Sequence, residues 1–292
     1  MLTPNVQRWR DAGRFEEVAG RPLYTQRREG DGPLLLFLHG FPSSSYDFRT
    51  LLALREQRAP ANALLLDFLG FGLSDKPAGH VYTLAWQADA AEELVRRAGS
   101  PAVFLVAHDM GTSVATELFA RELEGRGRIE LAGALLFNGS ILLDRASPTV
   151  GQKLLRSRLG PLFAQLTSER SFRLQFGRVF SAAHPLGREE AEDQWCLLAH
   201  GGGQRIGHLL VNYMAERERY VERWHGAFRD WPGRLSLTWG LEDPVATTAV
   251  LAGLRELRPG VPVRELPGIG HYPQLERPEL VSAALDDALA HV

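Results

Sequence analysis

The sequence predicts an α/β fold, with a mostly parallel sheet flanked by helices and an inserted helical lid. Three observations lead to this prediction. Continuous apolar runs, typical of strands buried on both faces, recur over the first 140 residues. Helical patterns separate these runs, as parallel strands require. Residues 141–231 then carry helical patterns without a strong strand run, and strands resume at Leu235.

The individual elements can be placed along the chain. Two short strands surround the turn Ala19-Gly20, and Gly99 is a stop signal for a helix. A further helix begins near residue 112 and ends near Gly125. The expected strands are 14–18, 21–27, 33–40, 61–70, 101–109, 134–140, 234–240 and 261–268, and the best-marked helices are 84–99 and 112–123.

The strand-free segment divides the chain. Residues 1–140 and 232–292 are expected to form the core that contains the sheet, and residues 141–231 the lid. Ligands of open α/β sheets bind at the carboxyl edge of the strands. A helical layer over that edge is therefore expected to cover a binding site.

Composition narrows the classes of function. The net charge of −2 gives no overall field that would favour nucleic acid or an anionic membrane. The basic run Arg217, Arg219 and Arg223 alternates with glutamates and is interpreted as a solvated helix face. A single cysteine, Cys196, excludes an internal disulfide and a cysteine metal cluster, which fits a reducing compartment. We expect a cytoplasmic protein without metal or cofactor.

Two further signals are missing from the sequence. The first 18 residues contain early charges and no apolar run, unlike a signal peptide. No segment approaches the roughly 20 apolar residues that cross a bilayer. No membrane span is therefore expected.

The stretch FLVAHDMGTSVATELFA, residues 104–120, indicates a strand, a sharp turn and a helix with Asp109 at the apex. Ala107 and Gly111, two residues before and after it, are small, as a strained turn that presents a nucleophile requires. The helix N-terminus favours the ionised carboxylate. The alternative is that Asp109 only caps the helix.

The loop FLHGFP, residues 37–42, ends another strand. In such an architecture the backbone N–H groups of Phe41 and Met110 would form an oxyanion hole beside residue 109. His39 and Pro42 are expected to border the same pocket. The alternative is an ordinary turn that ends the strand.

Asp243 and His271 each follow a strand near the end of the chain. The order nucleophile, acid, histidine is that of one arrangement of catalytic triads. His271 is the candidate base and Asp243 its partner. Glu242 and Asn138 are rival partners, and a structural role is expected for His108.

The motifs HGFPSSSYDF, DFLGFGLSDKP, HDMG, FNGSI, DPV and HYPQLE resemble the α/β-hydrolase superfamily. Within it they are similar to the aspartate-nucleophile branch of epoxide hydrolases and haloalkane dehalogenases, and most of all to the mesoderm-specific transcript group. The resemblance covers nearly the whole chain and is weakest in the lid. It implies an α/β-hydrolase fold with a cap domain.

A carboxylate nucleophile suits displacement at a saturated carbon. A serine would form an ether that the enzyme could not cleave, whereas Asp109 would form an ester. His271 would then activate a water that attacks the carbonyl carbon of Asp109, while Asp243 orients the imidazole. The Phe41 and Met110 N–H groups would hold the resulting oxyanion.

The leaving group is expected to be an epoxide oxygen. The family's dehalogenases usually carry tryptophan and asparagine where this chain has Met110 and Phe41, whose side chains cannot donate to a halide. Epoxide hydrolases resemble this sequence in the HGxP signature and use two lid tyrosines. Tyr213 matches the second of these, and Tyr220, one helical repeat further on, could share its face.

Several assignments in the lid have alternatives. The family's first lid tyrosine has no match in this chain, and Tyr213 itself could be a packing residue. Trp195 and Trp224 are expected to pack the lid, although an apolar pocket wall is compatible with both, and Trp195 is a candidate pocket residue.

The sequence therefore predicts a hydrolase that opens a small apolar epoxide to a diol. One alternative is a haloalkane dehalogenase-type hydrolase. Another is a non-catalytic ligand-binding or signalling protein built on the same frame.

Overall fold

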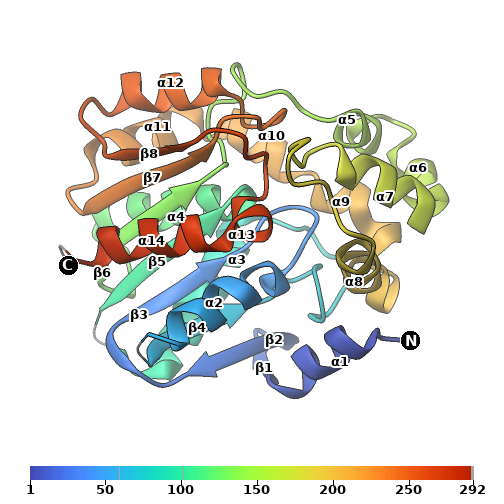
Figure 1. Cartoon of the computed structure of the whole chain (residues 1–292), viewed down its shortest axis with the longest axis horizontal. Helices are drawn as coiled ribbons and strands as arrows, with labels where there is room; N and C mark the ends of the chain where they lie inside the picture. Colours follow the sequence, from blue (N-terminus) through green and yellow to red (C-terminus); the bar gives the residue numbers. More distant parts are fainter. Residues whose placement is uncertain (59, 101, 291–292) are drawn as a thin grey trace.

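The computed structural model describes residues 1–58, 60–100 and 102–290, and within them the predicted architecture is present. Eight strands form one sheet in the order β1-β2-β4-β3-β5-β6-β7-β8 (Figure 1). The pairs β1–β2 and β2–β4 are antiparallel, and every other neighbouring pair is parallel. The sheet is thus mostly parallel, as the buried apolar runs predicted.

Each predicted strand run contains a strand of the sheet, although Pro101, within the predicted run 101–109, lies outside the described residues. The strands are β1 (Arg14–Val18), β2 (Arg21–Arg28), β3 (Asp31–Leu38), β4 (Ala61–Leu66), β5 (Val103–His108), β6 (Leu131–Phe137), β7 (Arg234–Gly240) and β8 (Val263–Leu266).

Helices cover both faces of the sheet because successive strand side chains point to opposite faces. Leu36 and Leu38 of β3 belong to the apolar cluster on one face, and Leu35 and Phe37 to the cluster on the other. Helices α3 (Leu84–Ala98), α4 (Met110–Leu123), α11 (Val221–Asp230) and α12 (Thr248–Leu257) contribute to the first cluster, and α1 (Pro4–Asp11), α2 (Arg49–Glu56) and α14 (Pro278–Leu289) to the second.

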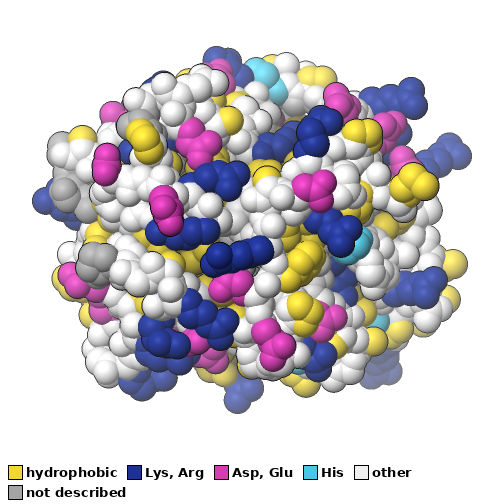
Figure 2. All heavy atoms as spheres, turned by 90° about the horizontal axis from the view of Figure 1, so that it is seen from below, with side chains coloured by type: hydrophobic (Ala, Val, Ile, Leu, Met, Phe, Trp, Pro, Cys, Tyr) yellow, Lys and Arg dark blue, Asp and Glu magenta, His cyan; other side chains and the backbone are white. Residues whose placement is uncertain are grey.

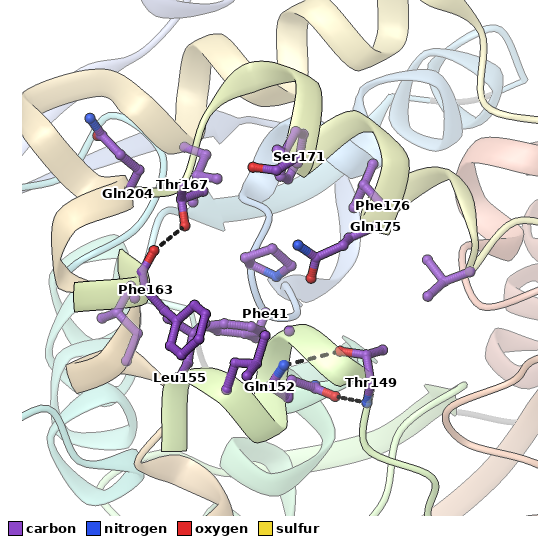
Figure 3. Close-up of a pocket in the computed structure, with 18 of the residues that line it drawn as sticks. Phe41, Thr149, Gln152, Leu155, Phe163, Thr167, Ser171, Gln175, Phe176 and Gln204 are labelled. Atoms are coloured by element: carbon purple, nitrogen blue, oxygen red, sulfur yellow. Dashed lines mark hydrogen bonds between the residues drawn. The ribbon is translucent and has the colours of Figure 1, made fainter. Parts of the chain in front are cut away.

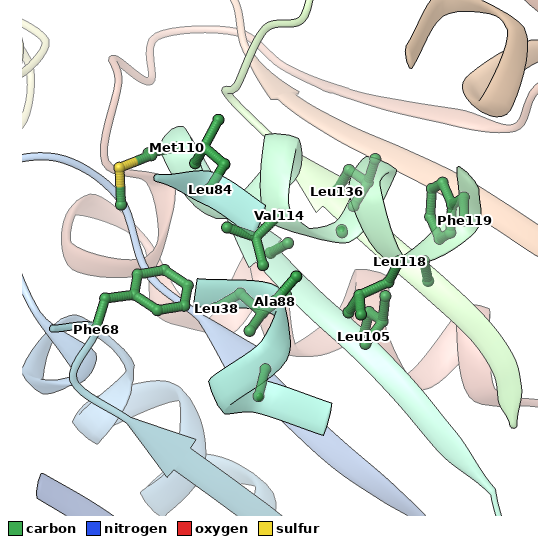
Figure 4. Packing of buried hydrophobic residues seen from close by; sticks show 14 of the residues in the cluster. Leu38, Phe68, Leu84, Ala88, Leu105, Met110, Val114, Leu118, Phe119 and Leu136 are labelled. Carbon is green, nitrogen blue, oxygen red and sulfur yellow. The ribbon is translucent and has the colours of Figure 1, made fainter. Parts of the chain in front are cut away.

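Helix α4 is the central element of the first face. Its residues from Met110 to Arg121 are all buried. Figure 4 shows Val114 and Leu118 of this helix packed against α3 and the strands below. Each buried leucine or valine contributes roughly 1.5–3 kcal/mol to stability, so this packing holds the turn before α4 firmly in place.

The helical insertion lies between β6 and β7, on the right in Figure 1. None of the helices in the described part of the chain combines the length and the apolar character needed to cross a bilayer. The insertion contains α5 (Val150–Arg156), α6 (Gly160–Leu166), α7 (Glu169–Gly177), α8 (Arg188–Ala199), the 3-10 helix η2 (His200–Ile206), α9 (Gly207–Leu210) and α10 (Tyr213–Arg219).

Helix α11 packs on the core, although it falls inside the segment 141–231 expected to form the lid. The Trp224 indole donates to Glu117 of α4 at 2.9 Å, and the ring of Trp231 stacks on Phe119 at 4.0 Å. We therefore propose that the core resumes at Val221, and that the lid ends with α10.

Candidate active site

Asp109 occupies the turn between β5 and α4 with φ +44° and ψ −113°. A positive φ is uncommon outside glycine and indicates local strain that the surrounding packing must hold. Two neighbouring glycines allow other parts of the chain to pack closely against this turn. A Cβ at Gly40 would lie 2.7 Å from the Asp109 Cβ, and one at Gly111 would clash with the Leu38 carbonyl oxygen.

The loop after β3 reaches the carboxylate of Asp109. The backbone N–H of Phe41 donates to Asp109 Oδ2 at 2.9 Å. Met110 follows as the first residue of α4, so its N–H is one of the groups that lack a partner within the helix. Both proposed oxyanion donors thus belong to the immediate surroundings of Asp109.

Asp243 and His271 are in direct contact. The imidazole Nδ1 lies 2.7 Å from Asp243 Oδ2. The other oxygen of Asp243 accepts from the N–H groups of Val245 and Ala246 at 2.7 and 3.0 Å. Glu242, the rival acid, has an exposed side chain. The acid that faces the imidazole is therefore Asp243.

Charges around His271 favour its protonated form. Burial alone would lower the pKa of His271, but the charge and hydrogen bond of Asp243, followed by the charge of Asp109, raise this pKa above its usual value. Asp109 is therefore one of the charges that act on the imidazole. A histidine with this environment is suited to accept a proton from water.

Asn138 and His108 form hydrogen bonds that hold Asp243 and the backbone of His271 in place. The Asn138 amide donates to Asp243 Oδ2 at 2.8 Å and exchanges two hydrogen bonds with Gly240, so it joins the ends of β6 and β7. His108 Nε2 lies 2.7 Å from the His271 carbonyl oxygen. Because burial lowers the pKa of His108 to about 3, this ring is neutral and holds the loop as a donor.

A small void of about 10 Å³ adjoins Asp109, and Tyr213, Gln152 and Arg217 also line it. Gln152 Nε2 donates to the Tyr213 hydroxyl oxygen at 3.0 Å, which leaves the hydroxyl hydrogen free for another acceptor. The Tyr213 ring packs on Phe41 with centroids 5.7 Å apart. Tyr213 is therefore held beside the candidate nucleophile.

Arg217 corrects the interpretation of the basic run as a solvated face. Its side chain is buried, its Nη2 lies 3.9 Å from Asp109 Oδ1, and its Nε donates to Ser113 Oγ at 2.8 Å. Helix α10 lies over the start of α4, so the side of α10 that carries this arginine faces the core. Tyr213 and Arg217 are four residues apart, which would have placed them on one helix face.

A larger cavity of about 360 Å³ lies between the core and helices α5–α7 (Figure 3). Phe41, Pro42 and His271 line it from the core side. Gln152 and Val245 line both this cavity and the small void, so they form the wall between the two. A substrate held in the larger cavity must pass this wall to reach Asp109.

The lining of the larger cavity is apolar with uncharged polar groups. In Figure 3, Phe163 and Leu155 face Ser171 and Gln175 across the space. Apart from His271, the described residues that line it include no ionisable side chain other than Tyr272. Such a volume and lining are typical of a pocket for a small apolar ligand.

Three expected pocket residues lie elsewhere. The His39 ring is fully buried, where its Nε2 accepts from the Phe68 N–H at 2.9 Å and its pKa is lowered by burial. Trp195 packs on Phe172 and borders a separate hollow near the N-terminus. Tyr220 follows the last residue of α10 and packs beside Trp224, with ring centroids 5.5 Å apart. None of the three lines the large cavity or the small void.

Comparisons with known proteins agree with this architecture. The chain is 52% identical over 284 residues to LipZ of Mycobacterium tuberculosis, covering 97% of this chain and 98% of LipZ. It is 33% identical over 290 residues to the mesoderm-specific transcript protein of Mus musculus, covering 95% and 85%. The expected similarity to that group is present, but LipZ shares more of the sequence.

Solved structures are similar in fold. The haloalkane dehalogenase DatA from Agrobacterium tumefaciens C58 matches with a TM-score of 0.78 and 21% identity, covering 96% of each chain. The epoxide hydrolase CorEH matches with a TM-score of 0.76 and 17% identity, covering 95% of this chain and 98% of its own. Residues 35–284 match the description "Alpha/beta hydrolase family". The chain is therefore a member of the alpha/beta hydrolase family.

Proposed function

We propose that this hydrolase opens an epoxide to a diol through a covalent ester on Asp109. The observation that carries the proposal is the small void that Asp109 and Tyr213 both line. A nucleophile for carbon and a proton donor for oxygen are the two groups that ring opening needs.

In the first step an oxygen of Asp109 attacks an epoxide carbon, and the carbon–oxygen bond of the ring breaks. The departing oxygen takes the hydroxyl proton of Tyr213. Burial raises the pKa of Tyr213 above its usual range, so the phenol keeps this proton until a strong base forms beside it. The Arg217 guanidinium, 4.6 Å from the centre of the tyrosine ring, stabilises the phenolate that remains.

In the second step His271 removes a proton from water, and the hydroxide adds to the carbonyl carbon of Asp109. The Phe41 and Met110 N–H groups hold the oxyanion. As the tetrahedral species collapses, the alkyl oxygen leaves with the proton from His271. The remaining proton of the water returns to Tyr213, so one epoxide and one water give one diol.

Arg217 also supports a second candidate, which is displacement of halide from a haloalkane. The side chains of Phe41 and Met110 offer a halide no donor, but a buried guanidinium beside the same void supplies a positive charge. In that reaction Tyr213 would not need to give up its proton.

A single turnover in heavy-oxygen water tests the covalent route. The Asp109 carboxylate should gain the label, and Asp109→Asn should abolish turnover. Asp144→Asn, which changes an exposed carboxylate, is the matched control and should retain activity. Diol formation without label on Asp109 would contradict the proposal. Halide release from haloalkanes, with epoxides left intact, would favour the second candidate.

A further inference from the structure

The lid exposes an unusual share of apolar side chains. Of the nine large hydrophobic residues that are exposed in the described part of the chain, five fall between residues 150 and 174. Their exposed fractions run from 51% to 67%. They are Val150, Leu159, Leu162, Leu166 and Leu174, and we refer to these five residues as the lid patch.

Three members of the lid patch share one helix face. Leu159 immediately precedes α6, and Leu162 and Leu166 lie within it. Their spacing of three and four residues places side chains on the same side of a helix. Val150 begins α5, and Leu174 belongs to α7. Helices α5, α6 and α7 all contribute lining residues to the large cavity, and Leu166 is the member of the lid patch that lines it.

Positive charge is concentrated in the same segment. Residues 150–178 contain six basic side chains and one acidic one, a net charge of +5 in a chain whose total is −2. Arg158, Arg170 and Arg178 are exposed, and no carboxylate of the described residues lies within 4.0 Å of them. Figure 2, which views the molecule from below, shows Lys and Arg side chains projecting at the right-hand end with hydrophobic ones among them.

The lid patch and the lining of the large cavity share a residue. Leu166 lines the cavity and is also 67% exposed, so one side chain belongs to both. Phe163, on the same helix, is half-buried and also lines the cavity. An apolar molecule leaving the surface at α6 would therefore enter an apolar lining directly.

We propose that the lid patch docks on an anionic lipid surface, from which the large cavity takes its apolar ligand. Binding of this kind grows with the apolar area inserted and with the attraction between basic side chains and acidic headgroups. The lid patch supplies the apolar area, and the arginines between its members supply the attraction to acidic headgroups. The protein lies on the surface and does not span it.

Co-flotation with vesicles tests this proposal without any substrate, so its outcome is independent of the reaction assigned to Asp109. The full-length protein should float with vesicles of phosphatidylcholine and phosphatidylglycerol, and much less with phosphatidylcholine alone. Added salt should weaken the binding because it screens the headgroup charge. Equal binding to both vesicles, or none to either, would overturn the proposal.

Two variants separate the contributions. Leu162→Glu with Leu174→Glu should weaken partition to anionic vesicles at least about tenfold, since it removes apolar area and adds negative charge. Val81→Glu with Leu123→Glu, which changes exposed apolar residues outside the lid patch, is the matched control and should bind as the unmodified protein does. A lid variant that still floats would contradict the proposal.

The contribution of the charge is tested separately by Arg158→Glu with Arg170→Glu, and Arg126→Glu with Arg234→Glu is the control. Only the first double variant should bind anionic vesicles more weakly. Thermal unfolding should show that these two double variants and the two described above are all folded.

Sedimentation without lipid tests whether the lid patch instead joins two copies of the chain. If the unmodified protein self-associates and Leu162→Glu with Leu174→Glu restores a monomer, the patch joins two copies of the chain, and the lipid proposal is wrong.

Discussion

The Arg217 guanidinium lies 3.9 Å from the Asp109 carboxylate, and each side chain is only 5% exposed. Two opposite charges at this depth compensate part of each other's desolvation. The guanidinium also donates to the Asp109 carbonyl oxygen at 3.4 Å and covers the ring of Tyr213. One residue of the lid therefore contacts both groups to which we assign the first chemical step.

Replacing Arg217 by methionine should reduce turnover by about 10²-fold, because the charge formed in the void loses its cation. The protein should also unfold at a lower temperature, since Asp109 then remains buried without a compensating charge. Steady-state kinetics and thermal unfolding measure the two effects. Arg219→Met, at an exposed position of the same helix, is the control. Unchanged turnover in the Arg217 variant would remove this residue from the mechanism.

Tyr213→Phe should lower epoxide opening by about 10²–10³-fold, because the departing oxygen loses its proton donor while the ring packing remains. Release of halide from haloalkanes should be affected far less. Rates on both substrate classes, with Tyr220→Phe as the control, measure this difference. If both tyrosine variants open epoxides at the original rate, the donor must be another group.

Gln152→Ala should reduce turnover through Tyr213. Loss of the amide leaves the Tyr213 oxygen without its 3.0 Å donor and also breaks the cap of α5, in which the Thr149 N–H donates to Gln152 at 2.7 Å. Thr149→Ala removes the other half of this cap, the hydroxyl that accepts from the Gln152 N–H at 3.2 Å, without touching Tyr213. Each should cost about 1 kcal/mol of stability, but only the Gln152 variant should show a marked fall in kcat. Equal kcat in the two would assign Gln152 a purely structural role.

Activity and stability should respond to pH in opposite directions at His271. The base must be neutral, so turnover should rise as pH increases through the raised pKa of His271. The ion pair with Asp243 contributes stability fully below about pH 6.5, the unfolded pKa, and this contribution is lost as pH rises through the higher folded pKa.

Asp243→Asn should shift the acidic limb of the pH–rate profile to lower pH, because the imidazole loses the charge that raises its pKa, and should lower the maximal rate. Glu242→Gln, at the exposed neighbouring position, is the control. A pH–rate profile that keeps its acidic limb in Asp243→Asn would show that another group titrates there.

The sequence by itself determined the sheet, its flanking helices and the strained turn at Asp109. These features depend on local properties of the sequence. Continuous apolar runs need burial on both faces of a sheet. A strained turn needs small residues beside its apex, because the backbone packs closely there. Asp243 and His271 could also be identified from the sequence, because each follows a predicted strand. The contact of His271 with Asp243 could be expected because parallel strands end at one edge.

Only the tertiary structure decided what surrounds Asp109. Helical spacing places Tyr213 and Arg217 on one face but does not say whether that face meets solvent or the core. Arg217 is buried because α10 lies over the start of α4, a contact between segments about 100 residues apart. For the same reason Trp195 and Tyr220, which suit a pocket wall by composition, lie away from it, since burial depends on which helices pack together.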